Sequence, residues 1–341
     1  MKASLELGLI FCLSLLSCSG SINHSDNKND LTRYGFNGKV KSVRAKPFDL
    51  IVEKDTFKIG NEINSASFNR NSLFEFNELG NLTSKKEFLY TGKVINEEIY
   101  TYNKSGLLIK RKEINNYGRG SYNDNVFVYD SKDSIVEWTI SNDSFKRVYK
   151  FYRDNRHRPI KKEAVENDSI VTSFSVEYDN FNNVITENQY KSGNNPVKLL
   201  TRKFNSKNLK IREKIIEYGT WDTLNYENVF IYDDKQNLMM EKSTIENDST
   251  YDEIKYDYHN NGELKEIKTT PKGADYFVIT TQKFNEYGDL TEHSYLPSND
   301  KPREIWIYNY KYDSHNNWIE KTEFKDGKPL RIIKRTIDYY N

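Results

Sequence analysis

The sequence contains few cysteines and histidines, and this scarcity excludes several kinds of site. Its only two cysteines are Cys12 and Cys18, so a mature chain that has lost its leader keeps one at most. Internal disulfides and thiolate metal sites are therefore excluded. The five histidines are not spaced as i, i+4 ligand pairs, so no metal site is expected.

The sequence also lacks the common catalytic and cofactor motifs. It has no G-x-S-x-G nucleophile elbow, no P-loop and no G-x-G-x-x-G fingerprint. We therefore expect no catalytic residue, no cofactor and no enzymatic activity. A formal net charge of +1 gives no support for nucleic-acid binding. The 50 acidic residues alternate with lysines, which is typical of cross-strand ion pairs, although a carbohydrate hydrolase that uses repeat-borne carboxylates remains an alternative.

The one notable apolar run, residues 7–16, is too short to span a bilayer. It leads into Leu15-Leu16-Ser17-Cys18, which resembles the bacterial lipoprotein signal. The resemblance implies that residues 1–17 are removed and that Cys18 is acylated, which would anchor the chain to a membrane. An ordinary secretory signal with a chance cysteine is the alternative.

Residues 18–30 are small and polar and predict a flexible tether. Ser19, which follows Cys18, resembles the residue found there in lipoproteins sent to the outer membrane. Asp26 and Asp30 resemble the acidic tethers of surface-exported lipoproteins. Together these resemblances imply the outer membrane or cell surface of a Gram-negative bacterium.

The remaining sequence is dominated by a repeat whose aromatic anchors are 23 to 28 residues apart. The anchors are Phe76, Tyr102, Tyr129, Tyr152, Tyr178, Phe204, Tyr232, Tyr258, Phe284 and Tyr312. Eight of the ten are followed directly by Asn or Asp, and eight have Gly, Asn or Asp four places on. The residue six places on is apolar except at Arg158 and Lys210. A period of this length signals a repeat array.

Each position in the repeat has a role in a hairpin. The aromatic ends a strand, the Asx side chain starts a turn, and the residue four places on supplies the left-handed conformation. Ten units predict an all-β fold, a repetitive antiparallel β-hairpin meander of about 20 strands that forms a long twisted or curled sheet or solenoid. Residues 31–75 are expected to form an N-terminal β cap, and residues 76–341 the array.

The pairs Tyr129-Asp130, Tyr178-Asp179, Tyr232-Asp233 and Tyr312-Asp313 are similar to the YD repeats of the RHS family. The resemblance covers roughly residues 72–341. It implies spiralling antiparallel sheets, in some members closed around a toxin cargo. The chain lacks the processing motif and C-terminal effector of those toxins. The resemblance therefore favours a repeat-containing lipoprotein, with an RHS-toxin-related accessory protein as an alternative.

The aromatic ladder near the C-terminus is the feature most relevant to function. Trp306, Tyr308 and Tyr310 share one face of a predicted strand, and Trp318 begins the next strand. These four residues are the candidate binding surface, although they could also form the core of a thin sheet. We expect a non-catalytic binding or scaffolding module for a glycan or protein partner, attached to the membrane through Cys18.

Overall fold

The structure, a computed structural model, describes residues 29–54, 56–63, 71–117, 120–192, 195–219, 222–246, 248–299 and 301–341. The predicted leader, Cys18 and the tether as far as residue 28 lie outside the described residues.

Within the described ranges the chain forms one short helix and 23 strands. In chain order they are α1 (Asp30–Arg33), β1 (Val40–Glu53), β2 (Thr56–Glu62), β3 (Ser72–Phe76), β4 (Leu82–Phe88), β5 (Val94–Tyr102), β6 (Leu108–Asn115), β7 (Ser121–Tyr129), β8 (Ile135–Asn142), β9 (Phe145–Arg153), β10 (Pro159–Glu166), β11 (Ser169–Tyr178), β12 (Val184–Lys191), β13 (Asn195–Phe204), β14 (Lys210–Tyr218), β15 (Thr223–Tyr232), β16 (Leu238–Ile245), β17 (Tyr251–Tyr258), β18 (Leu264–Lys272), β19 (Val278–Phe284), β20 (Leu290–Pro297), β21 (Glu304–Tyr312), β22 (Trp318–Lys325) and β23 (Lys328–Tyr339).

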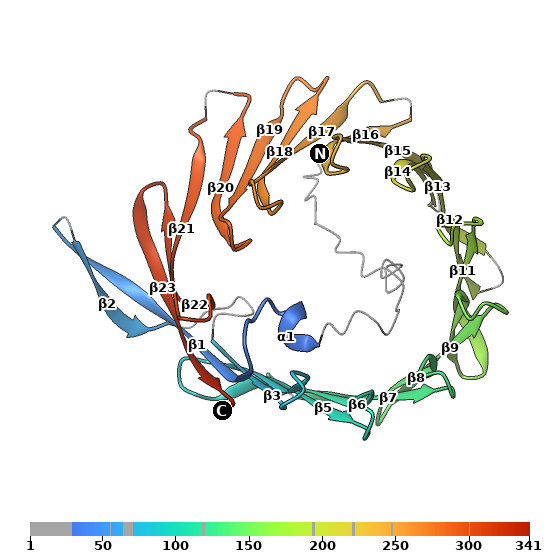
Figure 1. Cartoon of the computed structure of the whole chain (residues 1–341), viewed down its shortest axis with the longest axis horizontal. Helices are drawn as coiled ribbons and strands as arrows, with labels where there is room; N and C mark the ends of the chain where they lie inside the picture. Colours follow the sequence, from blue (N-terminus) through green and yellow to red (C-terminus); the bar gives the residue numbers. More distant parts are fainter. Residues whose placement is uncertain are drawn as a thin grey trace.

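The strands form a closed antiparallel barrel of 22 strands, so the prediction of an open sheet or solenoid was wrong, while its all-β class was right (Figure 1). Strands β3 to β23 pair in sequence, and β1 joins the two ends. On one side β1 pairs with β3, and on the other it pairs with β23 from Val40 opposite Tyr339 to Asp49 opposite Arg331. Segment 31–75, expected to cap an open edge, thus supplies the strand that closes the ring. Strands about 4.8 Å apart give a ring roughly 34 Å across before tilt widens it.

The ten repeated turns lie at one end of the barrel and share one backbone hydrogen-bond plan. Nine of them add an Asn or Asp side chain after the anchor position, and the turn after β17 has His259 there. In the turn from β11 to β12, Oδ1 of Asp179 accepts the backbone N–H groups of Phe181 and Asn183 at 2.8 and 2.9 Å. The N–H of Asn182 donates to the carbonyl of Asp179 at 3.2 Å. The predicted left-handed residue is confirmed in nine turns, where φ is positive at Gly80, Gly106, Asp133, Asn182, Asn208, Gln236, Gly262, Gly288 and Asn316. In the tenth turn it is His157 and not the predicted Arg156.

In one unit the predicted alignment is wrong by one residue. The turn from β9 to β10 is built on Asp154, whose Oδ1 accepts the N–H of Arg158 at 2.8 Å, and its left-handed residue is His157. The anchor position is therefore occupied by Arg153 and not by Tyr152. With Arg153 at the anchor position, Asp154 is the Asn or Asp residue that follows the anchor in the other units. The apolar position six places after the anchor is then occupied by Pro159 and not by Arg158.

Six units have tyrosine at the anchor position. In one of them, Tyr312 donates its hydroxyl to the carboxylate of Asp289 at 2.8 Å. In each of the other five, the hydroxyl donates to the carbonyl of the residue that opens the preceding return strand and so ties the unit to the one before it. This bond joins Tyr102 to Leu82 (2.7 Å), Tyr129 to Leu108 (2.8 Å), Tyr178 to Pro159 (2.6 Å), Tyr232 to Lys210 (2.8 Å) and Tyr258 to Leu238 (2.9 Å). Beside each repeated turn the strand register also shifts, as between Thr101 and Tyr102. Such β-bulges bend a strand pair and increase its twist, which favours closure.

The position of α1 identifies the inner wall of the barrel. Figure 1 shows α1 inside the ring beside β3, and Leu31 of this helix packs in a buried cluster with Phe74, Phe76 and Leu82. Val40 and Val43 of the closing strand β1 belong to the same cluster. Residues that are directly paired on adjacent strands point to the same face of the sheet. Following these pairs from strand to strand therefore shows which side chains face inward all around the ring. By this criterion the aromatic ladder faces inward.

The outer wall carries cross-strand ion pairs as well as exposed aliphatic side chains such as Val126 and Val128. Lys110 and Asp124 approach to 3.1 Å across β6 and β7, and Lys311 and Glu320 to 2.7 Å across β21 and β22. The β1–β2 hairpin projects away from the ring (Figure 1), with Ile51 and Val52 exposed.

Candidate ligand-binding wall

The four predicted binding residues lie together on the inner wall of β21 and β22. Trp306, Tyr308 and Tyr310 alternate along β21, and Trp318 opens β22 with its ring 6.1 Å from that of Tyr310. All four side chains are of intermediate exposure, so they are neither fully buried nor free in solvent. We call these four residues the C-terminal aromatic strip.

Two lysines of β22 lie against rings of this strip. The Nζ atom of Lys325 is 5.0 Å from the centre of the Trp306 ring, and that of Lys321 is 4.6 Å from Tyr308. Such cation–π contacts are worth roughly 0.5–2 kcal/mol each. They hold the rings and the charged groups in place together.

Both the hydroxyl and the ring of Tyr310 are held by neighbouring groups. Its hydroxyl donates to the carbonyl of Leu290 at 2.8 Å, and its ring is 6.0 Å from that of Tyr312. Burial raises the pKa of Tyr310, so the hydroxyl stays protonated as a donor.

Arg335 of β23 lies between two aromatic rings of the inner wall. Its guanidinium carbon is 3.2 Å from the ring centre of Trp318 and 5.3 Å from that of Phe36. Burial lowers the pKa of Arg335 to about 9, an effect that the nearby Asp289 partly opposes. Its Nε has no hydrogen-bond partner among the described residues.

Strands β7 to β10 lie on the other side of the ring from β21 and β22 (Figure 1). They carry a second aromatic cluster, which was not among the predicted site residues. The rings of Phe127 and Trp138 are stacked 5.8 Å apart, and those of Trp138 and Tyr149 are stacked 4.7 Å apart. The Nζ of Lys162 lies 4.6 Å from the centre of the Tyr149 ring and 5.8 Å from that of Phe151. We call these five residues the Lys162 cluster. The alternation of aromatic residues along residues 145–151 was the sequence signal that could have found it.

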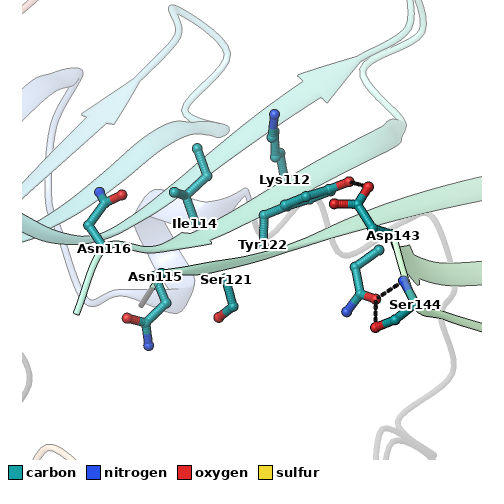
Figure 2. Close-up of a pocket in the computed structure, with 10 residues that line it drawn as sticks. Lys112, Ile114, Asn115, Asn116, Ser121, Tyr122, Asp143 and Ser144 are labelled. Carbon is teal, nitrogen blue, oxygen red and sulfur yellow. Dashed lines mark hydrogen bonds between the residues drawn. The ribbon is translucent and has the colours of Figure 1, made fainter. Parts of the chain in front are cut away.

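A polar recess of about 460 Å³ lies between the β6–β7 and β8–β9 hairpins (Figure 2). The hydroxyl of Tyr122 donates to Asp143, and this hydrogen bond raises the pKa of Tyr122. The Nζ of Lys112 lies 5.4 Å from the centre of the Tyr122 ring. Oδ1 of Asn142 accepts the N–H of Ser144 at 3.0 Å. These polar groups therefore stabilise the hairpins that carry them.

In the described ranges, no group of three or more His, Cys, Asp or Glu side chains is arranged to hold a metal ion. The described part of the chain also contains no helix with the length and apolarity that a membrane crossing needs.

No protein-family model and no curated protein matches the chain. Among solved structures, it is similar to the crystal structure of TcdB2-TccC3-Cdc42, with 10% identity, a TM-score of 0.45 and coverage of 89% of this chain and 18% of that one. It is also similar to the Photorhabdus luminescens Tc holotoxin pore, with 11% identity, a TM-score of 0.44 and coverage of 84% and 17%. The chain thus spans less than a fifth of these two chains.

A porin-like protein from Bacteroides uniformis ATCC 8492 is similar as well, with 11% identity, a TM-score of 0.30 and coverage of 89% of this chain and 98% of that one. Because all three TM-scores lie below 0.5, these likenesses assign neither a family nor a function to the chain.

Proposed function

We propose that this protein is a non-catalytic binding or scaffolding module of the bacterial envelope. In this proposal the chain is a YD-repeat-like lipoprotein, held at the outer membrane or cell surface by the lipid on Cys18. It binds a glycan or protein partner on its inner wall. The observation that carries the proposal is the pair of aromatic and cationic clusters on one concave face.

The barrel geometry favours a glycan over an extended peptide as the ligand. A peptide commonly adds as a strand to a free sheet edge. Among the described strands, every strand of the ring pairs on both sides, and only β2 keeps an open edge outside it. The inner wall instead offers aromatic rings and charged side chains, which suit the apolar faces and hydroxyl groups of sugars.

The charges on the outer wall support attachment through a lipid. A barrel wall that faces lipid presents an apolar band to it. Here ion pairs such as Lys283–Glu292, 2.9 Å apart, lie on the outer face of β19 and β20. The proposal therefore keeps both walls in water and anchors the barrel through Cys18.

The test is binding of the acyl-free Cys18→Ala chain to a panel of envelope polysaccharides and to envelope proteins, measured by calorimetry. Tyr308→Ala should weaken binding roughly tenfold while the folded signal is retained, because an aromatic contact on a ligand contributes about 1 kcal/mol or more. The matched control is Tyr276→Ala, which removes an exposed tyrosine of the β18–β19 connection. Equal affinities for the two variants would contradict this site. Turnover of a glycan, abolished by removal of one carboxylate, would contradict the non-catalytic role.

A further inference from the structure

Lys162 is a cation whose surroundings on the inner wall are aromatic. Along β10 it pairs with Phe151 of β9 on one side and with Phe174 of β11 on the other. Its Nζ also lies 5.9 Å from the ring centre of Trp138 and 4.6 Å from that of Tyr149. The rings thus surround the ammonium group and fix its position.

Lys162 differs from the inner-wall cations Arg202 and Lys198 in its lack of a counter-charge. Arg202 approaches Glu187 to 2.6 Å and Glu213 to 2.8 Å, and Lys198 approaches Glu217 to 3.0 Å. Lys162 makes no ion pair within 4 Å in the part of the chain that the structure describes, and burial lowers its pKa. A partly desolvated ammonium without a counter-charge favours an anion that arrives from the lumen.

The neighbouring rings add to this preference through their orientation. Phe127, Trp138 and Tyr149 stack on one another with interplanar angles of 13° and 21°. Their faces are therefore turned toward each other across the strands, and their edges point into the lumen. The edge of an aromatic ring carries partial positive charge. Ring edges and ammonium together form an electropositive patch with apolar surface beside it.

We propose that Lys162 is an anion-binding residue and that it binds the carboxylate of an acidic, uronate-bearing glycan on the inner wall. This inference rests on the proposed function and adds the charge of the ligand to it. A uronate sugar uses both features of the cluster, since its carboxylate meets the ammonium and its C–H groups pack against the rings. A free inorganic anion would use only the charge.

The test compares binding of oligosaccharides of polygalacturonate, alginate and hyaluronate with binding of a neutral β-1,4-galactan oligosaccharide. Each is titrated into the acyl-free protein by calorimetry at low and high sodium chloride. Lys162→Met should weaken uronate binding roughly tenfold or more, because it removes a charge-assisted contact. Lys162→Arg keeps the charge and should bind nearly as the unchanged protein does. The matched control is Lys150→Met, which removes an exposed lysine from the outer face of β9.

The outcomes separate this inference from the proposed function. Uronate binding that weakens with salt, falls in Lys162→Met and survives in Lys162→Arg and Lys150→Met supports it. Equal binding of the neutral oligosaccharide, or unchanged uronate binding in Lys162→Met, overturns it and leaves the proposed function standing. If sodium sulfate inhibits uronate binding more than sodium chloride does at the same ionic strength, Lys162 is a site for free anions only, and the inference is overturned. No binding of any glycan overturns both the inference and the glycan form of the proposed function. Circular dichroism of each variant verifies that the barrel is intact.

Discussion

Removal of a single anchor hydroxyl should weaken the barrel measurably. In Tyr232→Phe the ring stays and only the hydrogen bond to the carbonyl of Lys210, 2.8 Å long, is lost. Burial raises the pKa of Tyr232, so this hydroxyl is a proton donor throughout the physiological range. Phe204 and Phe284 occupy the same position in other units, so the ring alone is compatible with the turn.

The expected cost follows from the loss of one hydrogen bond without a cavity. The net contribution of such a bond is about 1 kcal/mol, and a carbonyl left without a partner adds to the loss. We therefore expect the free energy of unfolding to fall by about 1 to 2 kcal/mol. For a domain of this size that corresponds to a decrease in melting temperature of roughly 2 °C.

The assay is urea denaturation of the variant, combined with amide hydrogen exchange. Exchange should accelerate most in β14 to β16, because stability in a repeat array depends on each unit and its neighbours. The control is Tyr276→Phe, since no hydrogen bond of the Tyr276 hydroxyl is found among the described residues, and it should change stability by less than about 0.5 kcal/mol. If Tyr232→Phe is no more destabilising than Tyr276→Phe, the hydroxyl tie does not stabilise the barrel.

Three further predictions concern the turns and the acylation of Cys18. Gly288→Val should lower the free energy of unfolding by about 1–2 kcal/mol or more, because φ is +82° at this position. Gly288→Asn should be tolerated, because an Asn occupies the same position in the turn after β11. Equal losses of stability in the two variants, measured by urea denaturation, would contradict this. The backbone N–H groups of Ser134 and Lys132 lower the pKa of Asp130, so its stabilising effect is lost as pH falls through that lowered value. Asp130→Asn should therefore lower stability at pH 7 and converge with the unchanged protein as pH falls below about 4, and a difference in stability that does not change with pH would contradict the assignment. Mass spectrometry of the mature protein should find an acylated Cys18 at its N-terminus, and an unmodified peptide that reads through Ser17-Cys18 would refute the lipoprotein prediction.

Most of the local structure could be predicted from the sequence because each turn is determined by residues within six positions. The Asx cap, the left-handed residue and the return strand all have local chemical signatures. The unit around Asp154 was misaligned because Tyr152 provides an aromatic one position before Arg153, where the turn requires its anchor. The hydrogen bonds of that turn, and not the aromatic pattern, determine its register.

Closure of the barrel was missed because it depends on contacts between residues almost 300 positions apart. Ser42 and Asp338 hydrogen-bond at 2.7 Å across the seam, and no local pattern encodes that pairing. A partial signal was present in adjacent apolar residues such as Leu108-Ile109, which break strand alternation where the register shifts. Each such bulge bends a hairpin, and ten bends in the same sense favour a ring over an extended sheet.

The candidate site was only half predictable. The C-terminal aromatic strip follows from period-two alternation within one strand. The Lys162 cluster draws its rings from three strands, so its assembly depends on cross-strand register. Sequence periodicity within one strand does not determine that register.

Chemical cross-linking across the seam tests the closed ring most directly. In a chain that begins at Ser19 and so lacks cysteine, Ser42→Cys and Asp338→Cys place two thiols on directly paired residues of β1 and β23. A short thiol cross-linker should join them within one molecule at high yield and low protein concentration, as identified by peptide mass mapping. The control pair, Ser42→Cys with Asp257→Cys on the outer face of β17, should not join. An open sheet would hold its two ends on the order of 100 Å apart, so failure of the seam pair to cross-link within one molecule would contradict the barrel.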